Sequence, residues 1–199
     1  HRALQLARQA IGNTRPNPPV GAVIVRDGQI IGEGVTQPRG GSHAEVVAIR
    51  EAKGLTKNAT LFTTLEPCSY HGYTGPCVPI IVQSGISEVH IAAVDPNPRV
   101  HGSGIAALKS AGVRVLVGEE KEQALAVMEP HFKWITTGLP FVTAKYAMTM
   151  DGKTATATGH SQWISGIESR ERTHGMRSGS DAVMVGIGTV LQDNPQLTV

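Results

Sequence analysis

The stretch from residue 43 to residue 77 constrains this chain more than any other part of its sequence. It contains His43 and the chain's two cysteines, Cys68 and Cys77. An imidazole and two thiolates are ligands that zinc takes in proteins, and three protein ligands leave a fourth position open to water, as in catalytic zinc sites. The pattern therefore predicts a zinc site formed by His43, Cys68 and Cys77.

A carboxylate stands beside this ligand set. Glu45 lies two residues after His43, and Pro67 directly precedes Cys68. A histidine, a glutamate that is not a ligand and two cysteines after a proline form the general signature of zinc deaminases. The signature predicts hydrolytic loss of ammonia from an amino-substituted ring, with Glu45 as the catalytic proton carrier. The chain departs from it in one respect, because eight residues separate its cysteines.

His43 and Glu45 begin a predicted helix of residues 43–52. Side chains two residues apart point about 200° away from each other on a regular helix, so this pair can serve one site only from the helix's first turn. The free N–H groups and the dipole at that end also favour a bound anion. We therefore expect the site to lie at the amino end of this helix.

Composition argues against several classes of protein. The formal net charge is only +2 and the basic residues are scattered, so no nucleic-acid partner is expected. No apolar run approaches the roughly 20 residues of a membrane span, and the first residues have no secretory pattern. We expect a cytoplasmic enzyme whose cysteines bind metal rather than form a disulfide. Because the chain begins without methionine, we also expect its natural N-terminus to be missing.

Hydrophobic periodicity predicts helices and strands through the first two thirds of the chain. Helices are expected at residues 2–11, 43–52, 78–84, 105–111 and 121–136, and strands at 20–25, 29–34, 60–64, 88–94 and 113–117. Asp27-Gly28 makes the first two strands a hairpin. A hairpin followed by repeated helix–strand units predicts a mixed sheet with helices on both faces, which is a three-layer α/β/α domain.

The segment Thr137-Gly138-Leu139-Pro140 predicts a boundary between two domains, residues 1–138 and 139–199. Beyond it, strands are expected at 141–148 and 181–185, a turn at 149–153, a helix at 167–177 and a short helix opened by residues 186–189. About 60 residues with two strands are too few to bury an independent core of this type. We therefore expect the second α/β domain to be incomplete here.

Three polar residues lie in loops next to predicted strand ends, where sheets of this kind bind ligands. They are Asn17, Asp95 and Asn97, and they are candidate substrate-binding residues. Asparagine and aspartate are equally common as turn formers, and that alternative stays open. His71 is read as a loop residue, with a ligand or substrate contact as the alternative, and the remaining histidines, His131 among them, are read as surface or packing residues.

Segments on both sides of the predicted boundary resemble the RibD family of riboflavin-biosynthesis enzymes. They are residues 17–25, the metal pattern with its long insert, residues 95–98, residues 144–153 and residues 186–195. The resemblance implies a cytidine-deaminase-like zinc domain followed by the start of a dihydrofolate-reductase-like α/β domain. The chain departs from the family pattern at Thr36, where many members have a histidine.

The resemblance also implies a function in two steps. The first domain would use zinc to deaminate 2,5-diamino-6-(5-phosphoribosylamino)pyrimidin-4-one, and the second would reduce the ribosyl group to ribityl with NADPH. The implied NADP contacts are Ala147, Trp163, Thr189 and Asp193. The implied contacts to the phosphorylated substrate are Lys145, Ser161, Arg177 and Leu197. Related enzymes commonly form dimers or tetramers, so a homo-oligomer is expected.

Two other functions fit part of the pattern. A nucleic-acid-editing deaminase would share the zinc chemistry, but it would need a basic groove or stacking aromatic residues, and only 4% of this chain is aromatic. A structural zinc module without catalysis would need no open coordination position. Glu45 beside such a position argues against that second alternative.

Overall fold

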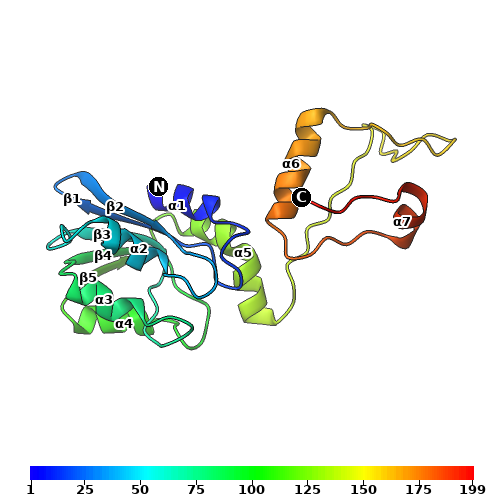
Figure 1. Cartoon of the computed structure of the whole chain (residues 1–199). Helices are drawn as coiled ribbons and strands as arrows, with labels where there is room; N and C mark the ends of the chain where they lie inside the picture. The colour runs from blue at the N-terminus through cyan, green and yellow to red at the C-terminus, as the bar shows by residue number, and fades with distance from the viewer. The chain divides into compact units, whose positions relative to one another are not determined.

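The computed structural model describes residues 1–199, which divide into two compact units. The first unit is His1–Phe141 and the second is Val142–Val199 (Figure 1). The domain assignment made from the sequence, 1–138 and 139–199, stays a prediction, because compactness alone does not show that either part folds independently. None of the helices is long and apolar enough to cross a membrane.

A five-stranded mixed sheet forms the centre of the first unit. Its strands are β1 (Gly21–Arg26), β2 (Gln29–Val35), β3 (Thr60–Leu65), β4 (Glu88–Ala93) and β5 (Arg114–Val117). They lie in the order β2-β1-β3-β4-β5. β1 is antiparallel to both of its neighbours, whereas β3, β4 and β5 are parallel. The predicted mixed sheet is therefore confirmed.

Helices cover both faces of this sheet (Figure 1). The helices of the first unit are α1 (Arg2–Gln9), α2 (Ala44–Glu51), α3 (Cys77–Gln83), α4 (Ser103–Ser110) and α5 (Lys121–Thr137). α1 and α5 pack together on one face, and α2, α3 and α4 follow one another on the other. The three-layer α/β/α architecture is confirmed.

Aliphatic side chains fill the space between the layers, as β1 illustrates. Ala22 and Ile24 belong to the larger apolar cluster, whereas Val23 between them packs with Ala3 and Leu6 of α1. Successive side chains of a strand point to opposite faces of the sheet, so β1 supplies both cores. All three strand residues are buried, because helices cover the sheet on both sides.

The loops that form the candidate site lie together at one end of the sheet's strands. β2, β3 and β4 all finish at this end, and β1 begins there because it runs antiparallel to them. The segments that follow these strands, or precede β1, carry Asn17, Thr36, Glu66 and Asp95. Polar side chains far apart in the sequence are thereby brought to the same end of the sheet.

The second unit contains two helices and no strand. These are α6 (Ile167–Ser178) and α7 (Ile187–Asp193), which confirm the predicted helices, and a backbone turn joins Thr149 to Lys153 as predicted. The strands predicted at 141–148 and 181–185 are wrong. A strand exists only through hydrogen bonds to a neighbouring strand, and neither segment has one.

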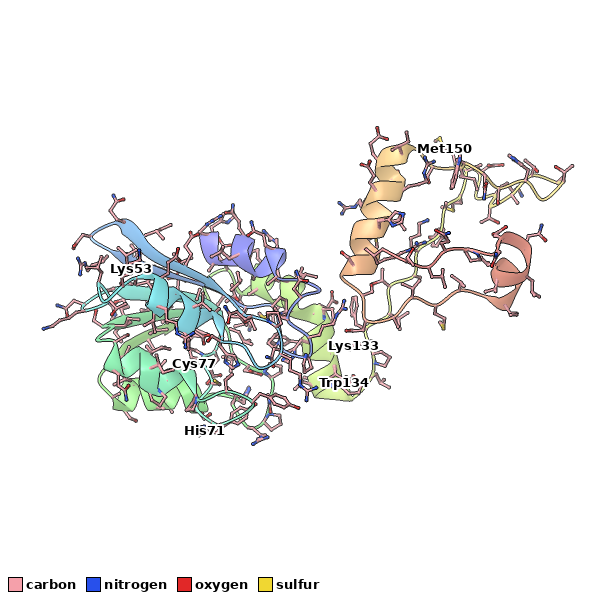
Figure 2. All side chains as sticks on the ribbon, viewed as in Figure 1. Lys53, His71, Cys77, Lys133, Trp134 and Met150 are labelled. Atoms are coloured by element: carbon pink, nitrogen blue, oxygen red, sulfur yellow. The ribbon has the colours of Figure 1, made fainter.

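Side chains of the second unit remain largely exposed. Met150 is fully exposed at the tip of a turn (Figure 2), and neither α6 nor α7 contains a buried residue. The apolar pattern that suggested strands here therefore has no core to pack into.

Candidate metal centre and active site

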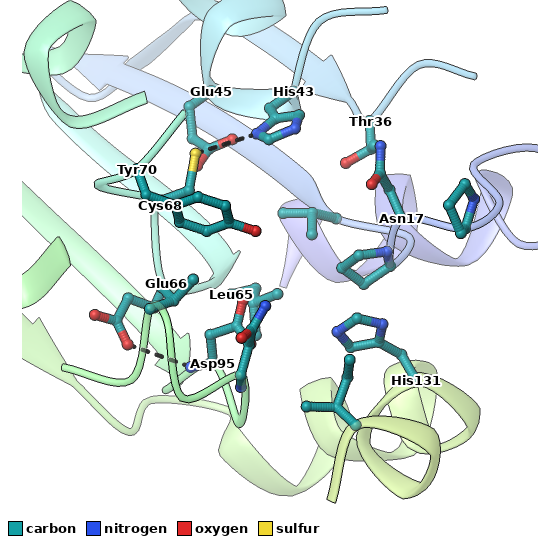
Figure 3. Close-up of a pocket in the computed structure, with 16 residues that line it drawn as sticks. Asn17, Thr36, His43, Glu45, Leu65, Glu66, Cys68, Tyr70, Asp95 and His131 are labelled. Carbon is teal, nitrogen blue, oxygen red and sulfur yellow. Dashed lines mark hydrogen bonds between the residues drawn. The ribbon is translucent and has the colours of Figure 1, made fainter. Parts of the chain in front are cut away.

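His43 and Glu45 meet at the amino end of α2. His43 is the residue that caps the helix, with extended backbone angles of φ −72° and ψ 161°, and Glu45 lies in the first turn. Because His43 stands just outside the helical spiral, its ring is free of the 200° separation that regular helical spacing would impose. Figure 3 shows the two side chains side by side at one end of a pocket.

The three predicted ligands converge on one point. Nδ1 of His43 lies 3.5 Å from Sγ of Cys68 and 3.3 Å from Sγ of Cys77. The three donor atoms all lie within 4.8 Å of one another, and both cysteines are free. In a tetrahedral zinc site with ordinary bond lengths, sulfur and nitrogen ligands are about 3.6 Å apart. The donor set therefore has the chemistry and the spacing that zinc requires.

Local structure places the two sulfur atoms. Cys68 lies in the loop after β3, and Cys77 is the first residue of α3. The backbone N–H of Cys77 points to Sγ of Cys68 at 3.4 Å, which helps to stabilise a thiolate there. On the far side of the imidazole, Nε2 of His43 lies 3.3 Å from Oγ1 of Thr74. That contact fixes the ring so that Nδ1 faces the sulfurs, as partners of metal-binding histidines usually do.

The protonation of the cysteines follows from their closeness. The hydrogen bond between the two sulfurs lowers the pKa of Cys68 and raises the pKa of Cys77, which is also buried. The hydrogen bond to Cys68 raises the pKa of His43. The two cysteine sulfurs thus share one proton. A divalent cation that replaced this proton would stabilise both sulfurs as thiolates.

Glu45 has the protonation behaviour of a general acid–base catalyst. Its side chain is buried, and this burial raises its pKa to about 7, with the nearby Cys68 thiolate adding to the effect. A carboxyl group with a pKa near ambient pH can both accept and donate a proton. The position of Glu45 two residues after His43 predicts its role as a proton carrier. The structure adds the burial that raises its pKa.

A pocket with a volume of about 220 Å³ opens beside this group. His43, Glu45 and Cys68 line one end of it (Figure 3). The lining also includes the three candidate substrate-binding residues, Asn17, Asp95 and Asn97, together with Thr36, Tyr70 and His131. Loops that lie far apart in the sequence therefore form one cavity with the candidate metal ligands His43 and Cys68, while the metal-binding and substrate-binding roles stay predictions.

Asp95 and Asn97 also form turns, so the two alternatives for them are compatible. The backbone N–H of Asn97 donates to Oδ1 of Asp95 at 2.8 Å, and that of Arg99 donates to Oδ1 of Asn97 at 3.1 Å. Burial raises the pKa of Asp95 to about 6. The turn thus holds a partly desolvated carboxyl group against the pocket.

Glu66 is a buried residue of the site that the sequence reasoning missed. Its carboxylate accepts hydrogen bonds from four backbone N–H groups, those of Asp95, Gly102, Gly104 and Ile105, at 2.9 to 3.3 Å. It thereby ties the loop after β4 and the start of α4 to the segment that leads into Cys68. A charged residue directly after a buried strand was the available signal.

Eight predicted contacts of the reductase lie in the second unit. They are Lys145, Ala147, Ser161, Trp163, Arg177, Thr189, Asp193 and Leu197. The contacts seen there are local. Nη1 of Arg177 donates to the carbonyl oxygens of Gln196 and Thr198, and the guanidinium of Arg170 stacks on Trp163. These eight roles stay predictions.

Two family models match the chain in succession. Residues 1–93 match the cytidine and deoxycytidylate deaminase zinc-binding region, and residues 140–199 match the RibD C-terminal domain. The first match includes His43, Glu45, Cys68 and Cys77.

Curated relatives match the chain from end to end. The riboflavin biosynthesis protein RibD of Aquifex aeolicus is 47% identical over 197 residues, which are 99% of this chain and 55% of that protein. The RibD of Bacillus amyloliquefaciens is also 47% identical, over 98% of this chain and 53% of its own length. The chain thus spans about half the length of the curated relatives that it matches.

A solved structure from Thermotoga maritima is similar to this chain along almost its whole length. It is a diaminohydroxyphosphoribosylaminopyrimidine deaminase/5-amino-6-(5-phosphoribosylamino)uracil reductase. It is 45% identical and matches 98% of this chain and 56% of its own with a TM-score of 0.93. The order of the two matched regions, the relatives that match the whole chain and the convergence of the candidate ligands lead to one conclusion: the chain belongs to the RibD family of riboflavin-biosynthesis enzymes, and its residues 1–93 contain the cytidine-deaminase-like, zinc-binding region.

Proposed function

We propose that the first unit is a zinc-dependent deaminase of 2,5-diamino-6-(5-phosphoribosylamino)pyrimidin-4-one in riboflavin biosynthesis. The observation that carries this proposal is the combination of three converging donor atoms with a buried carboxyl group at the end of a pocket. The Thermotoga protein, which is named as a deaminase of this substrate, supports the choice of substrate.

The chain's own residues would perform the proton transfers. His43, Cys68 and Cys77 would hold zinc, which when bound polarises a water molecule and lowers its pKa. Glu45 would take one proton from a water molecule as the water's oxygen adds to the ring carbon that carries the amino group, and it would pass this proton to the adjacent ring nitrogen. It would then take the remaining proton from the new hydroxyl group and give it to the amino nitrogen, so that the carbon–nitrogen bond breaks, ammonia leaves and a ring carbonyl beside a protonated ring nitrogen remains.

The pocket would hold the rest of the substrate in place. Asn17, Asp95 and Asn97 offer amide and carboxyl groups along its wall, and the hydrogen bonds of the 95–99 turn limit the movement of Asp95 and Asn97. A pyrimidine ring has both donors and acceptors on its edge, which such groups can pair with. These residues are therefore proposed to orient the ring so that its amino group lies next to Glu45.

Ammonia release tests the proposed function directly. The chain is loaded with one equivalent of zinc and incubated with the diaminopyrimidinone phosphate, and ammonia is measured with a coupled enzyme. We expect zinc-dependent ammonia release that a chelator abolishes and added zinc restores. A zinc-loaded, folded protein that releases no ammonia would contradict the proposal.

The second unit is proposed to begin the reductase of the full-length protein. Ala147, Trp163, Thr189 and Asp193 would contact NADPH, and Lys145, Ser161, Arg177 and Leu197 the phosphorylated substrate. The match to the RibD C-terminal domain supports this. The test is oxidation of NADPH by the full-length protein when it is supplied with the deaminated product. Sedimentation of the same protein tests the proposed homo-oligomer.

A cytoplasmic location is part of the same proposal, because the two ligand cysteines must stay reduced to bind zinc. Neither alternative function gains a specific observation. A purely structural zinc site would have no use for a pocket that opens beside a buried carboxyl group. Binding of tRNA or single-stranded DNA by the zinc-loaded chain would instead favour an editing deaminase.

A further inference from the structure

One buried polar atom in the pocket has no partner within the protein. It is Nε2 of His131, a residue of α5. Figure 3 shows its ring directed from α5 into the pocket, on the side opposite His43 and Glu45. From the sequence alone this histidine is expected to be a surface or packing residue, and the structure adds that it lies in the lining of the pocket.

An unpaired buried nitrogen costs stability, so a folded protein rarely keeps one without a reason. None of the other side chains that line the pocket, Asp95 and Asn97 included, forms a hydrogen bond with this nitrogen. A nitrogen that faces a ligand pocket can instead be paired by the ligand.

The chemistry of this nitrogen restricts the group that would pair with it. Burial lowers the pKa of His131 to about 4, so the imidazole is uncharged at neutral pH and offers no charge to a phosphate. An uncharged imidazole nitrogen either donates or accepts, depending on the position of its one proton. A hydroxyl group does both, so it pairs with Nε2 in either case.

We propose that His131 is a substrate-binding residue whose Nε2 hydrogen-bonds a hydroxyl group of the pentose attached to the pyrimidine ring. This inference rests on the proposed function, which places the reacting amino group at Glu45. His131 lies toward the other end of the pocket (Figure 3), where the part of the substrate remote from the reacting carbon would lie. The pocket would thus bind the sugar as well as the base.

A binding experiment with two ligands tests the proposal. The zinc-loaded Glu45→Gln protein, in which turnover is expected to be slower by about 10²–10⁴, is titrated with the complete substrate and with 2,5,6-triaminopyrimidin-4-one, which lacks the sugar. The same titrations are repeated after adding His131→Phe. We expect the complete substrate to bind about tenfold more weakly, the value of one buried hydrogen bond, and the sugar-free base to bind equally well.

Two further variants separate a hydrogen bond from packing. Ile135→Val removes one methylene from the same wall of the pocket without touching a polar group, and it should affect both ligands alike. His131→Gln keeps a group that can donate and accept, so it should recover part of the lost affinity. It also serves as the test variant if His131→Phe does not fold.

The outcomes distinguish this inference from the proposed function. Equal affinity of the complete substrate for both proteins, the same loss for both ligands, or no measurable binding of either would overturn the role of His131. Absence of ammonia release by the unmodified chain would refute the deaminase. A selective loss for the sugar-bearing ligand would support the role of His131 even then.

Discussion

His43 and Glu45 lie two residues apart, yet the fold places them in different surroundings that suit the different tasks proposed for them. His43 caps α2 and turns Nδ1 toward the sulfurs, whereas Glu45 is buried in the first turn and stays outside the ligand set. Cys68 and Cys77 complete the set from a loop and from the start of another helix. The proposed metal binding and the proposed proton transfer are thereby assigned to residues two positions apart in one chain segment.

Replacement of Glu45 by glutamine tests this separation. Glutamine keeps the size of the side chain but cannot carry a proton, so we expect zinc to remain bound while kcat falls by about 10²–10⁴. Zinc content is measured by metal analysis and kcat by ammonia release. Full turnover by a zinc-loaded Glu45→Gln protein would show that another group moves the proton.

His131 gives a prediction for stability as a function of pH. Its pKa is about 4 in the folded protein and 6.5 in an unfolded chain, so the unfolded state binds the extra proton as the pH falls through this range. The folded state therefore loses stability between about pH 6.5 and 4, by up to about 3 kcal/mol. His131→Phe removes this contribution, and its free energy of unfolding should fall less steeply with acid.

Urea denaturation at several pH values between 4 and 7 measures the effect. Glu45 and Asp95 also titrate in this range, because burial raises their pKa values, but both proteins contain them. The difference between wild type and variant therefore isolates His131. Parallel pH profiles for the two proteins would contradict the prediction.

The junction of β2 and α2 determines where the helix end lies. A Cβ atom on Gly34 would collide with the carbonyl oxygen of Ala44, the first residue of α2. This close approach fixes the helix against the sheet, and with it His43 and Glu45. Glycine is required here because any side chain would push the helix away.

We expect Gly34→Ala to lower the free energy of unfolding by about 1–3 kcal/mol and to weaken zinc binding, because α2 must shift. Urea denaturation and a zinc titration with a competing chelator are the measurements. Gly28→Ala is the matched control. Gly28 has a φ of +74° but open space around it, so alanine there should strain the turn and leave zinc affinity unchanged. Equal zinc affinity for Gly34→Ala and wild type would contradict the prediction.

The carboxylate of Glu66 holds the loop after β4 and the start of α4 through four hydrogen bonds, and Glu66→Gln tests how much these bonds stabilise the protein. The carboxamide replaces one acceptor oxygen by a nitrogen that donates, so about two of the four N–H groups lose their partner. We expect a loss of roughly 2–4 kcal/mol in the free energy of unfolding. Glu129→Gln, at an exposed position of α5, should change it by less than about 0.5 kcal/mol. Similar values for the two variants would show that the N–H groups find other partners.

Local patterns predicted the elements of the first unit well. The five strands and five helices begin and end within two residues of the expected positions, because periodicity, turns and glycines are encoded locally. The strands expected at 141–148 and 181–185 are absent, because strand formation depends on a partner that a local pattern does not specify. The candidate donor atoms could be named from residue types, whereas the support given by Glu66 and the role proposed for His131 depend on contacts across the fold.

The two units differ in how much of their surface is buried. The first has a continuous apolar core around its sheet, whereas no residue from 139 to 199 is buried. Chains without a buried core open readily and are cut by proteases in their open state. The three proposed zinc ligands all lie in the first unit, so the integrity of the proposed site should not depend on the second.

Limited proteolysis of the zinc-loaded chain tests this difference. We expect the segment from 142 to 199 to be cleaved first, for instance by trypsin at the arginines of α6, while a fragment close to residues 1–141 persists with one zinc ion. Mass spectrometry identifies the fragments, and metal analysis and ammonia release follow the site. Chelation of zinc should speed the loss of this fragment, since a ligand that binds only the folded state protects it. Digestion of both units at one rate, with or without zinc, would show that they open together and that the core and the metal do not stabilise the first unit separately.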